Sequence, residues 1–386
     1  MADLSVFRDQ YRQEKQALWA HIANSAANGR GLKRSLMRLA TLADKLLIQL
    51  WNQAGFDNGE SLIAVGGFGR GELFPSSDLD VLVLLPEHAN PDESEELKNR
   101  LENFIGSCWD SGLEIGSSVR TLKDCLEESA KDITVQTSLL ESRFITGSKS
   151  LFAKFQSSYQ AAMDPQAFFV AKSLELQQRH NKFENTPYSL EPNCKESPGG
   201  LRDLQIILWV TRAAGLGSTW DDLAIKGLAT PLEVKQLKRN EAVLSLIRAR
   251  LHLLAKRRED RLVFDLQHAL AESFGYQAKS TPEGKHTQRA SEVLMRQYYW
   301  AAKAVTQLNQ ILMLNIEAYL QAQRGDIRIE VRRLNDHFDE RNGLLEVAQD
   351  DLYQKHPHAI LETFLMYQQT HGVKGLSAKT LRALYN

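Results

Sequence analysis

The stretch GGFGRGELFPSSDLDVLVLL, residues 66–85, ends in an apolar run with two acidic residues at its start. The run at residues 79–85 follows turn residues and is rich in Val and Leu, which predicts a buried strand, and residues 61–66 predict another. Alternate residues of a strand point to the same face, so Asp78 and Asp80 should project together while Leu79 enters the core. Because a buried carboxylate without a partner is costly, we expect Asp80 to have a function.

Two adjacent carboxylates repel each other unless a cation lies between them, and Mg²⁺ or Mn²⁺ prefers carboxylate and phosphate oxygens. Gly66 and Gly67 would let the backbone approach a phosphate chain closely, and Arg70 could neutralise one phosphate. The stretch therefore predicts a metal-dependent nucleotide site. Three alternatives stay open: Asp78 caps a turn in PSSD, Ser77 is a turn former rather than a ligand, and Arg70 is a surface residue.

The spacing of the glycines excludes two common phosphate motifs. There is no GxxxxGK[ST] loop, and Gly67, Gly69 and Gly71 do not match GxGxxG. The glycine pair followed by a DxD sequence resembles the nucleotidyltransferases of the DNA polymerase β superfamily. That resemblance implies a two-metal site with a third acid on a neighbouring strand, for which Glu114 is the candidate.

The remaining pattern predicts an α+β protein, with a polymerase β-like nucleotidyltransferase core (a small mixed sheet with helices) and a mainly helical bundle domain. Two helices are expected before residue 54, a helix at 93–112 and a third strand at 113–121. Further helices are expected at 134–142, 165–184, 201–213, 231–257 and 286–321. The predicted domains are an N-terminal helical segment (1–54), the core (55–150), a helical substrate- or nucleotide-binding domain (151–325) and a C-terminal tail (326–386).

Composition limits the classes of partner. The 386 residues include 47 Lys and Arg against 48 Asp and Glu, a net charge of -1, so no global field favours nucleic acid or a membrane surface. No signal peptide or membrane span is recognisable, which predicts a cytoplasmic protein. The three cysteines are far apart and are expected to be reduced and chemically silent.

Two further segments carry candidate site residues. KESPGGLRD places Lys195, Gly199, Gly200 and Arg202 before a predicted helix, where they could bind a triphosphate; a turn with an Arg202–Asp203 ion pair is the alternative. RARLHLLAKRREDR, residues 248–261, is either a solvated helix face or an electropositive rim for the triphosphate or a partner. It lacks the interleaved aromatic residues expected for binding single-stranded nucleic acid.

Four segments together resemble one narrower family. They are VGGFGRGELFPSSDLDVLVL, GSSVRTLKDCLEESAKDITVQTSLLESRFITGS, LEPNCKESPGGLRDLQIILW and EDRLVFDLQHALAESFGY. In order and approximate spacing they are similar to the uridylyltransferase that modifies the PII nitrogen-signalling protein. This resemblance implies transfer of UMP from UTP to a tyrosine of PII, with a divalent metal and release of pyrophosphate. It also implies an N-terminal portion that lacks the uridylyl-removing and glutamine-sensing domains.

Other functions fit the same residues. A different protein or an RNA 3′ end could be the acceptor, although the charge balance argues against RNA. A non-catalytic module that binds PII or UTP would fit as well, but both aspartates are present.

Overall fold

The computed structural model describes residues 4–57, 59–280, 287–325 and 330–385. The chain divides into two compact units. The first comprises Met1–Asp164, Tyr188–Ser197 and Glu241–Tyr299, and the second comprises Pro165–Pro187, Pro198–Asn240 and Trp300–Asn386. Both units are assembled from separated segments, unlike the contiguous domains that the sequence predicts.

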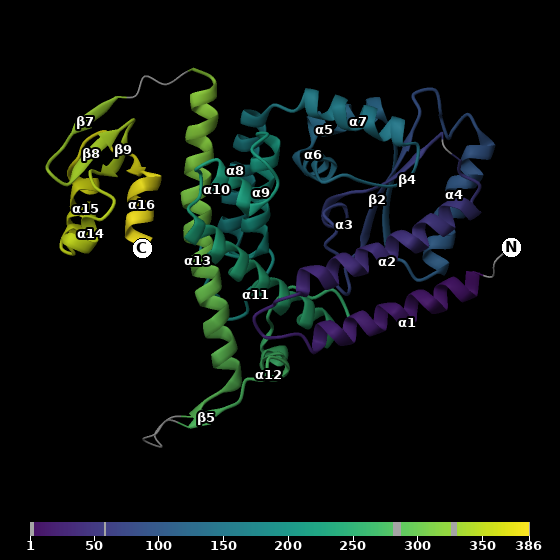
Figure 1. The fold of residues 1–386 in the computed structure, drawn as a ribbon, viewed down its shortest axis with the longest axis horizontal. Helices are drawn as coiled ribbons and strands as arrows, with labels where there is room; N and C mark the ends of the chain where they lie inside the picture. Colours follow the sequence, from purple (N-terminus) through teal and green to yellow (C-terminus); the bar gives the residue numbers. More distant parts are fainter. Residues whose placement is uncertain (1–3, 58, 281–286, 326–329, 386) are drawn as a thin grey trace. The chain divides into compact units, whose positions relative to one another are not determined.

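The first unit contains a four-stranded mixed sheet in the order β3-β2-β1-β4 (Figure 1). Its strands are β1 (Ser61–Ala64), β2 (Leu79–Leu85), β3 (Ile115–Thr121) and β4 (Arg143–Gly147). β2 runs antiparallel to β1 and parallel to β3, and β1 runs antiparallel to β4. β1 is buried along its whole length and β2 everywhere except Asp80, because helices cover both faces of the sheet. The predicted mixed sheet and α+β class are confirmed; β4 was not predicted.

Before residue 165 the described part of this unit contains the helices α1 (Leu4–Ala23), α2 (Leu32–Gln53), α3 (Gly66–Gly69), α4 (Glu95–Asp110), α5 (Leu122–Lys131), α6 (Ile133–Leu140) and α7 (Lys149–Ala162). Polar side chains fix where they begin: Ser94 accepts a hydrogen bond from the Leu97 amide, and Thr121 and Asp124 form a capping box. α1 packs along α2, α2 contacts α4 and β4, and α7 contacts β1 and β4 (Figure 1). The predicted N-terminal helix pair is confirmed.

Later segments complete both units with the helices α8 (Pro165–Lys182), α9 (Leu201–Ala213), α10 (Trp220–Ile225), α11 (Pro231–Ala255), α12 (Phe264–Ser273) and α13 (Ala290–Gln323), and the short hairpin β5 (Lys279–Ser280) and β6 (Thr287–Gln288). The predicted apolar stripe of α13 is buried; Leu294, Tyr298 and Val305 have no exposed surface. Within the described ranges, no helix combines the length and the apolar character that a bilayer crossing requires.

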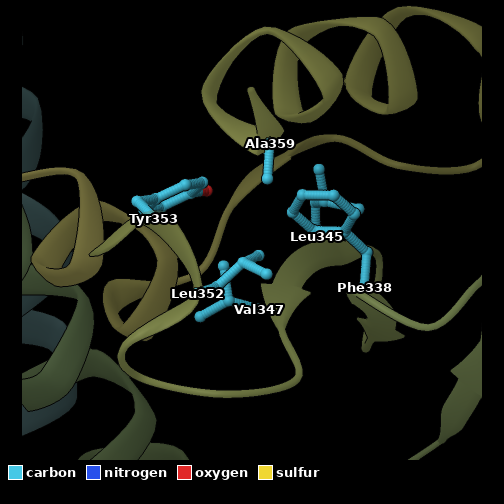
Figure 2. Close-up of a cluster of buried hydrophobic side chains, with 6 residues drawn as sticks. All are labelled: Phe338, Leu345, Val347, Leu352, Tyr353 and Ala359. Atoms are coloured by element: carbon cyan, nitrogen blue, oxygen red, sulfur yellow. The ribbon is translucent and has the colours of Figure 1, made fainter. Parts of the chain in front are cut away.

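The C-terminal segment, which the sequence predicts only as a tail, contains strands and helices. It forms a second sheet in the order β10-β9-β8-β7, with β7 (Val331–Arg333), β8 (Phe338–Arg341), β9 (Leu344–Val347) and β10 (Gly375–Leu376). Helices α14 (Leu352–Lys355), α15 (Ala359–Gln369) and α16 (Ala378–Tyr385) accompany it. Figure 2 shows the core that they share, formed by Phe338, Leu345, Val347, Leu352, Tyr353 and Ala359. The strands of this sheet have at most four residues each, too few for a clear alternating pattern.

Candidate active site

The two candidate acids lie at the start of β2, where Asp78 and Asp80 stand on either side of the buried Leu79. Both carboxylates are exposed to solvent, whereas the following residues of β2 are buried. The expectation that Asp80 is buried is therefore wrong, since the strand starts at the rim of the sheet. Alternation along the strand still places the two acids on the same side, as predicted.

Two glycines leave room around the Asp80 carboxylate. A Cβ atom at Gly116, which pairs with Asp80 across β2 and β3, would lie 2.9 Å from Asp80 Oδ1. A Cβ atom at Gly66 would lie 3.4 Å from Asp80 Oδ2, and Gly66 has a φ of 58°, which favours glycine. Gly67 directly follows in the first turn of α3. The sequence pattern does not single out Gly116, although a glycine inside a predicted strand often marks a place where another group approaches the backbone closely.

The electrostatic surroundings of Asp80 favour a bound cation. Partial desolvation raises the pKa of Asp80, and the negative charge of Asp78 raises it further, while Arg258 and Lys195 act in the opposite direction. Two neighbouring carboxylates form an oxygen-rich site that suits a hard divalent ion.

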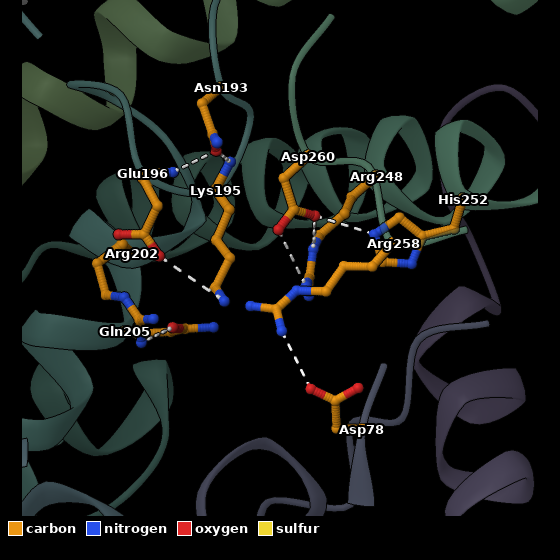
Figure 3. A network of polar contacts seen from close by, with 10 residues as sticks. All are labelled: Asp78, Asn193, Lys195, Glu196, Arg202, Gln205, Arg248, His252, Arg258 and Asp260. Atoms are coloured by element: carbon orange, nitrogen blue, oxygen red, sulfur yellow. Dashed lines mark hydrogen bonds and ion pairs between the residues drawn. The ribbon is translucent and has the colours of Figure 1, made fainter. Parts of the chain in front are cut away.

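Arg258 reaches Asp78 from one loop, and Lys195, on another loop, pairs with Glu196 at 3.7 Å and acts on Asp80 through its charge (Figure 3). Arg258 Nη1 donates to Asp78 Oδ2 at 3.1 Å, and each side chain is about half exposed (54% and 46%). Lys195 is held in a turn in which Asn193 Oδ1 accepts from the amides of Lys195 at 3.0 Å and Glu196 at 2.8 Å. The sequence singled out both cations, but not their position beside the acids.

The two loops pair with each other through the backbone. Asn193 and Arg261 form an antiparallel bridge, the Cys194 amide donates to the Asp260 carbonyl at 2.8 Å, and the Leu262 amide donates to the Pro192 carbonyl at 2.9 Å. Cys194 is buried, and this burial raises the pKa of its thiol. All three cysteines are free and buried.

A buried polar network supports the second loop (Figure 3). Asp260 Oδ1 accepts from Arg248 Nε at 2.6 Å and lies 2.9 Å from His252 Nε2. Arg250 is also buried and donates to the carbonyls of Ser273 at 2.6 Å and Ser25 at 2.5 Å. Arg248 and Arg250 therefore belong neither to a solvated face nor to an electropositive rim. The exposed cations of the segment are Lys256, Arg257, Arg258 and Arg261.

Arg70 and Ser77 have structural partners. The Arg70 guanidinium pairs with Glu141 and with Glu72, the latter at 3.1 Å, rather than projecting as a surface residue. These carboxylates compete with the predicted phosphate contact. The Ser77 amide donates to the Phe74 carbonyl at 3.1 Å, so Ser77 forms a turn just ahead of Asp78.

Glu114 immediately precedes β3, and its carbonyl accepts from the Leu79 amide at 2.9 Å. Its backbone thus lies beside the acids, but its carboxylate interacts with Lys15 of α1. In the described part of the chain no three His, Cys, Asp or Glu side chains are grouped so that they could hold a metal ion, so the predicted three-acid cluster is not formed. Glu114, Lys15 and Arg258 line a pocket of about 280 Å³, with Tyr11, Trp19 and Ser77 among its other walls.

The other predicted residues belong to the second unit. The Gly199 amide donates to Asp203 Oδ2 at 2.7 Å. Gly199 has a φ of 77°, and a Cβ atom added to it would lie 2.1 Å from the Ala302 carbonyl oxygen, so only glycine fits at this position. Gly200 is the N-cap of α9. Arg202 donates to Gln205 Oε1 at 3.0 Å, while buried Asp203 pairs with Arg179 at 2.5 Å.

Three family models match the chain: "GlnD PII-uridylyltransferase" over residues 167–313, "Uridylyltransferase GlnD third domain" over 338–386, and "Nucleotidyltransferase domain" over 47–133. The last of these contains Asp78 and Asp80.

Curated relatives carry the description bifunctional uridylyltransferase/uridylyl-removing enzyme. The chain is 55% identical over 379 residues to the one from Cupriavidus pinatubonensis, which covers 98% of this chain and 42% of the relative. It is 58% identical over 350 residues to one from Burkholderia mallei, covering 90% of this chain and 39% of the relative. The chain thus spans about two fifths of the length of these relatives, and it belongs to the GlnD PII-uridylyltransferase family.

Proposed function

We propose that this chain transfers UMP from UTP to a tyrosine of the PII signal-transduction protein and releases pyrophosphate. The observation that carries the proposal is the pair Asp78 and Asp80 at the start of β2, faced by Arg258 and Lys195. Family membership supports the choice of UTP and PII. UTP is supplied in the cytoplasm, where we expect the chain to act.

The residues fit a divalent metal ion. Asp78 and Asp80 would hold Mg²⁺ or Mn²⁺ through carboxylate oxygens, and Gly116 and Gly66 leave room around the oxygens of Asp80. When bound, such ions neutralise triphosphate charge and lower the pKa of an acceptor hydroxyl. We keep Glu114 as the proposed third carboxylate, which requires its side chain to turn away from Lys15.

The protein's own groups would then bind and orient the reactants. Lys195 and Arg258 would contact phosphate oxygens of the nucleotide. Arg258 would then leave its ion pair with Asp78 and bind the phosphate instead. The first-turn amides at Gly66 and Gly67 have no intrahelical acceptors and could donate to phosphate. Ser77, Gly199, Gly200 and Arg202 remain proposed nucleotide contacts. Arg70 would act indirectly, by fixing the loop through Glu141.

The reaction is an in-line displacement. The tyrosine oxygen releases its proton to solvent water and forms a bond to the α-phosphorus, while the bond from that phosphorus to the bridging oxygen breaks and pyrophosphate leaves. Holding the oxygen and the phosphorus in line is the main contribution that the protein can make.

The test is incubation of the purified chain with PII, Mg²⁺ or Mn²⁺ and α-labelled UTP, with label on PII and pyrophosphate release as the readouts. We expect transfer that Asp80→Asn abolishes and that Asp9→Asn, an exposed aspartate of α1, leaves unchanged. Transfer that survives Asp80→Asn would overturn the metal assignment. UTP binding without transfer by the folded chain would identify a binding module, and label on RNA instead of PII would identify another acceptor.

A further inference from the structure

The pocket of about 280 Å³ in the first unit adjoins the acids of β2. Ser77 and Leu79, the two sequence neighbours of Asp78, line it. Arg258 lines it as well and donates to Asp78 Oδ2 at 3.1 Å (Figure 3). A ligand in the pocket would therefore lie next to the carboxylate site.

One wall of the pocket comes from α1 and is aromatic. Tyr11, Lys15 and Trp19 line the pocket, and their spacing of four residues places them on one face of the helix. Phe74, in the segment before β2, adds a third ring. Aromatic side chains bind flat ring systems by stacking, and a phosphate chain has no such surface. The wall therefore suits a ligand that contains a planar ring.

The polar side chains around the pocket are mostly basic. Its lining includes Lys15, Lys256, Arg257 and Arg258, with Glu114 as the acidic residue. Lys15 Nζ lies 5.0 Å from the centroid of the Trp19 ring; partial desolvation lowers the pKa of Lys15, and the charge of Glu114 raises it. Ammonium and guanidinium groups donate hydrogen bonds and accept none, so the ring should carry carbonyl oxygens rather than amino groups.

The backbone fixes the loop that carries these cations. α11 ends at Ala255, and Lys256 has a φ of 53°, a left-handed conformation that is uncommon for a residue with a side chain. This bend ends the helix and leads the chain into the loop with Arg258. Further along the loop, Asp260 Oδ1 accepts from Arg248 Nε at 2.6 Å. The basic wall is thus anchored on both sides.

We propose that this pocket binds the uracil ring of UTP, so that α1 selects the base. The inference rests on the proposed function and adds the residues that decide which nucleotide is used. A nucleotide joins a planar ring to a phosphate chain through one ribose, which matches an aromatic pocket beside a carboxylate site. Uracil offers two carbonyl oxygens to the donors, whereas cytosine has an amino group in place of one of them and would leave Lys15 without an acceptor.

Glu114 connects the pocket with the carboxylate site. In the described conformation its charge acts on Lys15. When Glu114 turns toward Asp78 and Asp80 as the proposed third carboxylate, Lys15 becomes available to a carbonyl oxygen of uracil. Binding of the base and completion of the carboxylate set would then favour each other.

The experiment measures binding of labelled UTP, CTP, GTP and ATP to the full chain with Mg²⁺, by equilibrium dialysis. PII is left out, so the readout does not depend on transfer. We expect UTP to bind at least about tenfold more tightly than each of the others. Lys15→Met should weaken UTP binding about tenfold and leave CTP binding nearly unchanged, because it removes a donor that only uracil uses. Trp19→Ala should weaken both about tenfold or more, because it removes a stacking surface.

The matched control is Lys45→Met, because Lys45 is an exposed lysine of α2 that does not line the pocket. It should bind all four nucleotides as the unaltered chain does, and circular dichroism establishes that each variant is folded. UTP binding no tighter than that of CTP or GTP, or a preference for UTP that survives Lys15→Met, overturns the proposal. So does a Lys15→Met chain that binds UTP normally and has a raised KM for PII, which would assign the pocket to the acceptor.

The failure of this inference is distinguishable from the failure of the proposed function. Selective UTP binding that Lys15→Met removes, without label on PII, would contradict the transfer and support the base pocket. Label on PII with an unchanged base preference in Lys15→Met would support the transfer and overturn the base pocket.

Discussion

Gly116→Ala is the sharpest test of the carboxylate site, because it adds one methyl group beside Asp80 and removes no functional atom. The added Cβ would lie 2.9 Å from Asp80 Oδ1, whereas ordinary contacts begin at 3.4 Å. The carboxylate must therefore retreat by about 0.5 Å. Gly116 is exposed on β3, so the methyl group should change the free energy of unfolding by less than about 0.5 kcal/mol.

The size of the effect follows from that displacement. A misplacement of about 1 Å can cost about a hundredfold in rate, so half of it should lower kcat/KM for UMP transfer about tenfold. This corresponds to about 1.4 kcal/mol of lost transition-state stabilisation. Label transfer to PII measures the rate, and electron paramagnetic resonance of Mn²⁺ measures metal affinity in the absence of UTP. We expect Mn²⁺ affinity to fall as well.

Gly106→Ala is the control, because Gly106 is an exposed residue of α4 with no atom within 4 Å of a virtual Cβ. It should leave kcat/KM unchanged and stabilise the chain by about 1 kcal/mol, the usual gain of alanine over glycine in a helix. If Gly116→Ala transfers UMP and binds Mn²⁺ as the unaltered chain does, Asp80 is not the residue whose position matters.

Two substitutions and a change of pH test other contacts of the first unit. Arg258→Ala should lower kcat/KM about tenfold or more, since it removes the cation beside Asp78, with a change in stability below about 0.5 kcal/mol because both side chains are half exposed. Arg70→Met should destabilise the chain by about 3 kcal/mol in urea unfolding, because it takes a guanidinium from nearly buried Glu141. Burial lowers the pKa of His252 in the folded chain, so as the pH falls this histidine is protonated in the unfolded state before it is protonated in the folded state. The free energy of unfolding should therefore fall below about pH 6.5, by up to about 1.4 kcal/mol per pH unit.

Each of these has a matched comparison. Arg257→Ala removes a neighbouring exposed arginine that pairs with Glu259 and should leave transfer unchanged. Changing Glu141 to Gln together with Arg70→Met should recover most of the lost stability, and a double variant no more stable than Arg70→Met would contradict the ion-pair explanation. If the free energy of unfolding of His252→Gln still falls below about pH 6.5 as steeply as that of the unaltered chain, groups other than His252 cause the fall.

Local pattern predicted much of the fold. The bounds of β2 and α9 match the predicted ranges, because an unbroken apolar run and a strong helical stripe are independent of distant partners. β4 was missed, since its five residues at the sheet edge have only one buried side chain and depend on pairing with β1. The C-terminal sheet was missed for the same reason, because its strands have at most four residues.

The residues of the candidate site likewise fall into those that a local pattern predicts and those that depend on distant contacts. Asp78 and Asp80 are recognisable because their spacing is local. Arg258 lies 180 residues from Asp78 along the chain, so its role beside the acids depends on a contact that no local pattern encodes. Gly116 acquires its meaning only from its register opposite Asp80.

The segmented composition of the first unit has a consequence for its biosynthesis. Its last segment ends at Tyr299, about 135 residues after the first segment ends at Asp164. At about 5–20 residues per second, a ribosome needs roughly 7–27 s to synthesise that interval. Lys195 follows Asp164 by 31 residues and Arg258 follows it by 94, so for most of this time the acidic rim of the nascent sheet lacks Arg258. Slow codons or a chaperone acting in this window would affect the yield of this unit more than that of a contiguous domain.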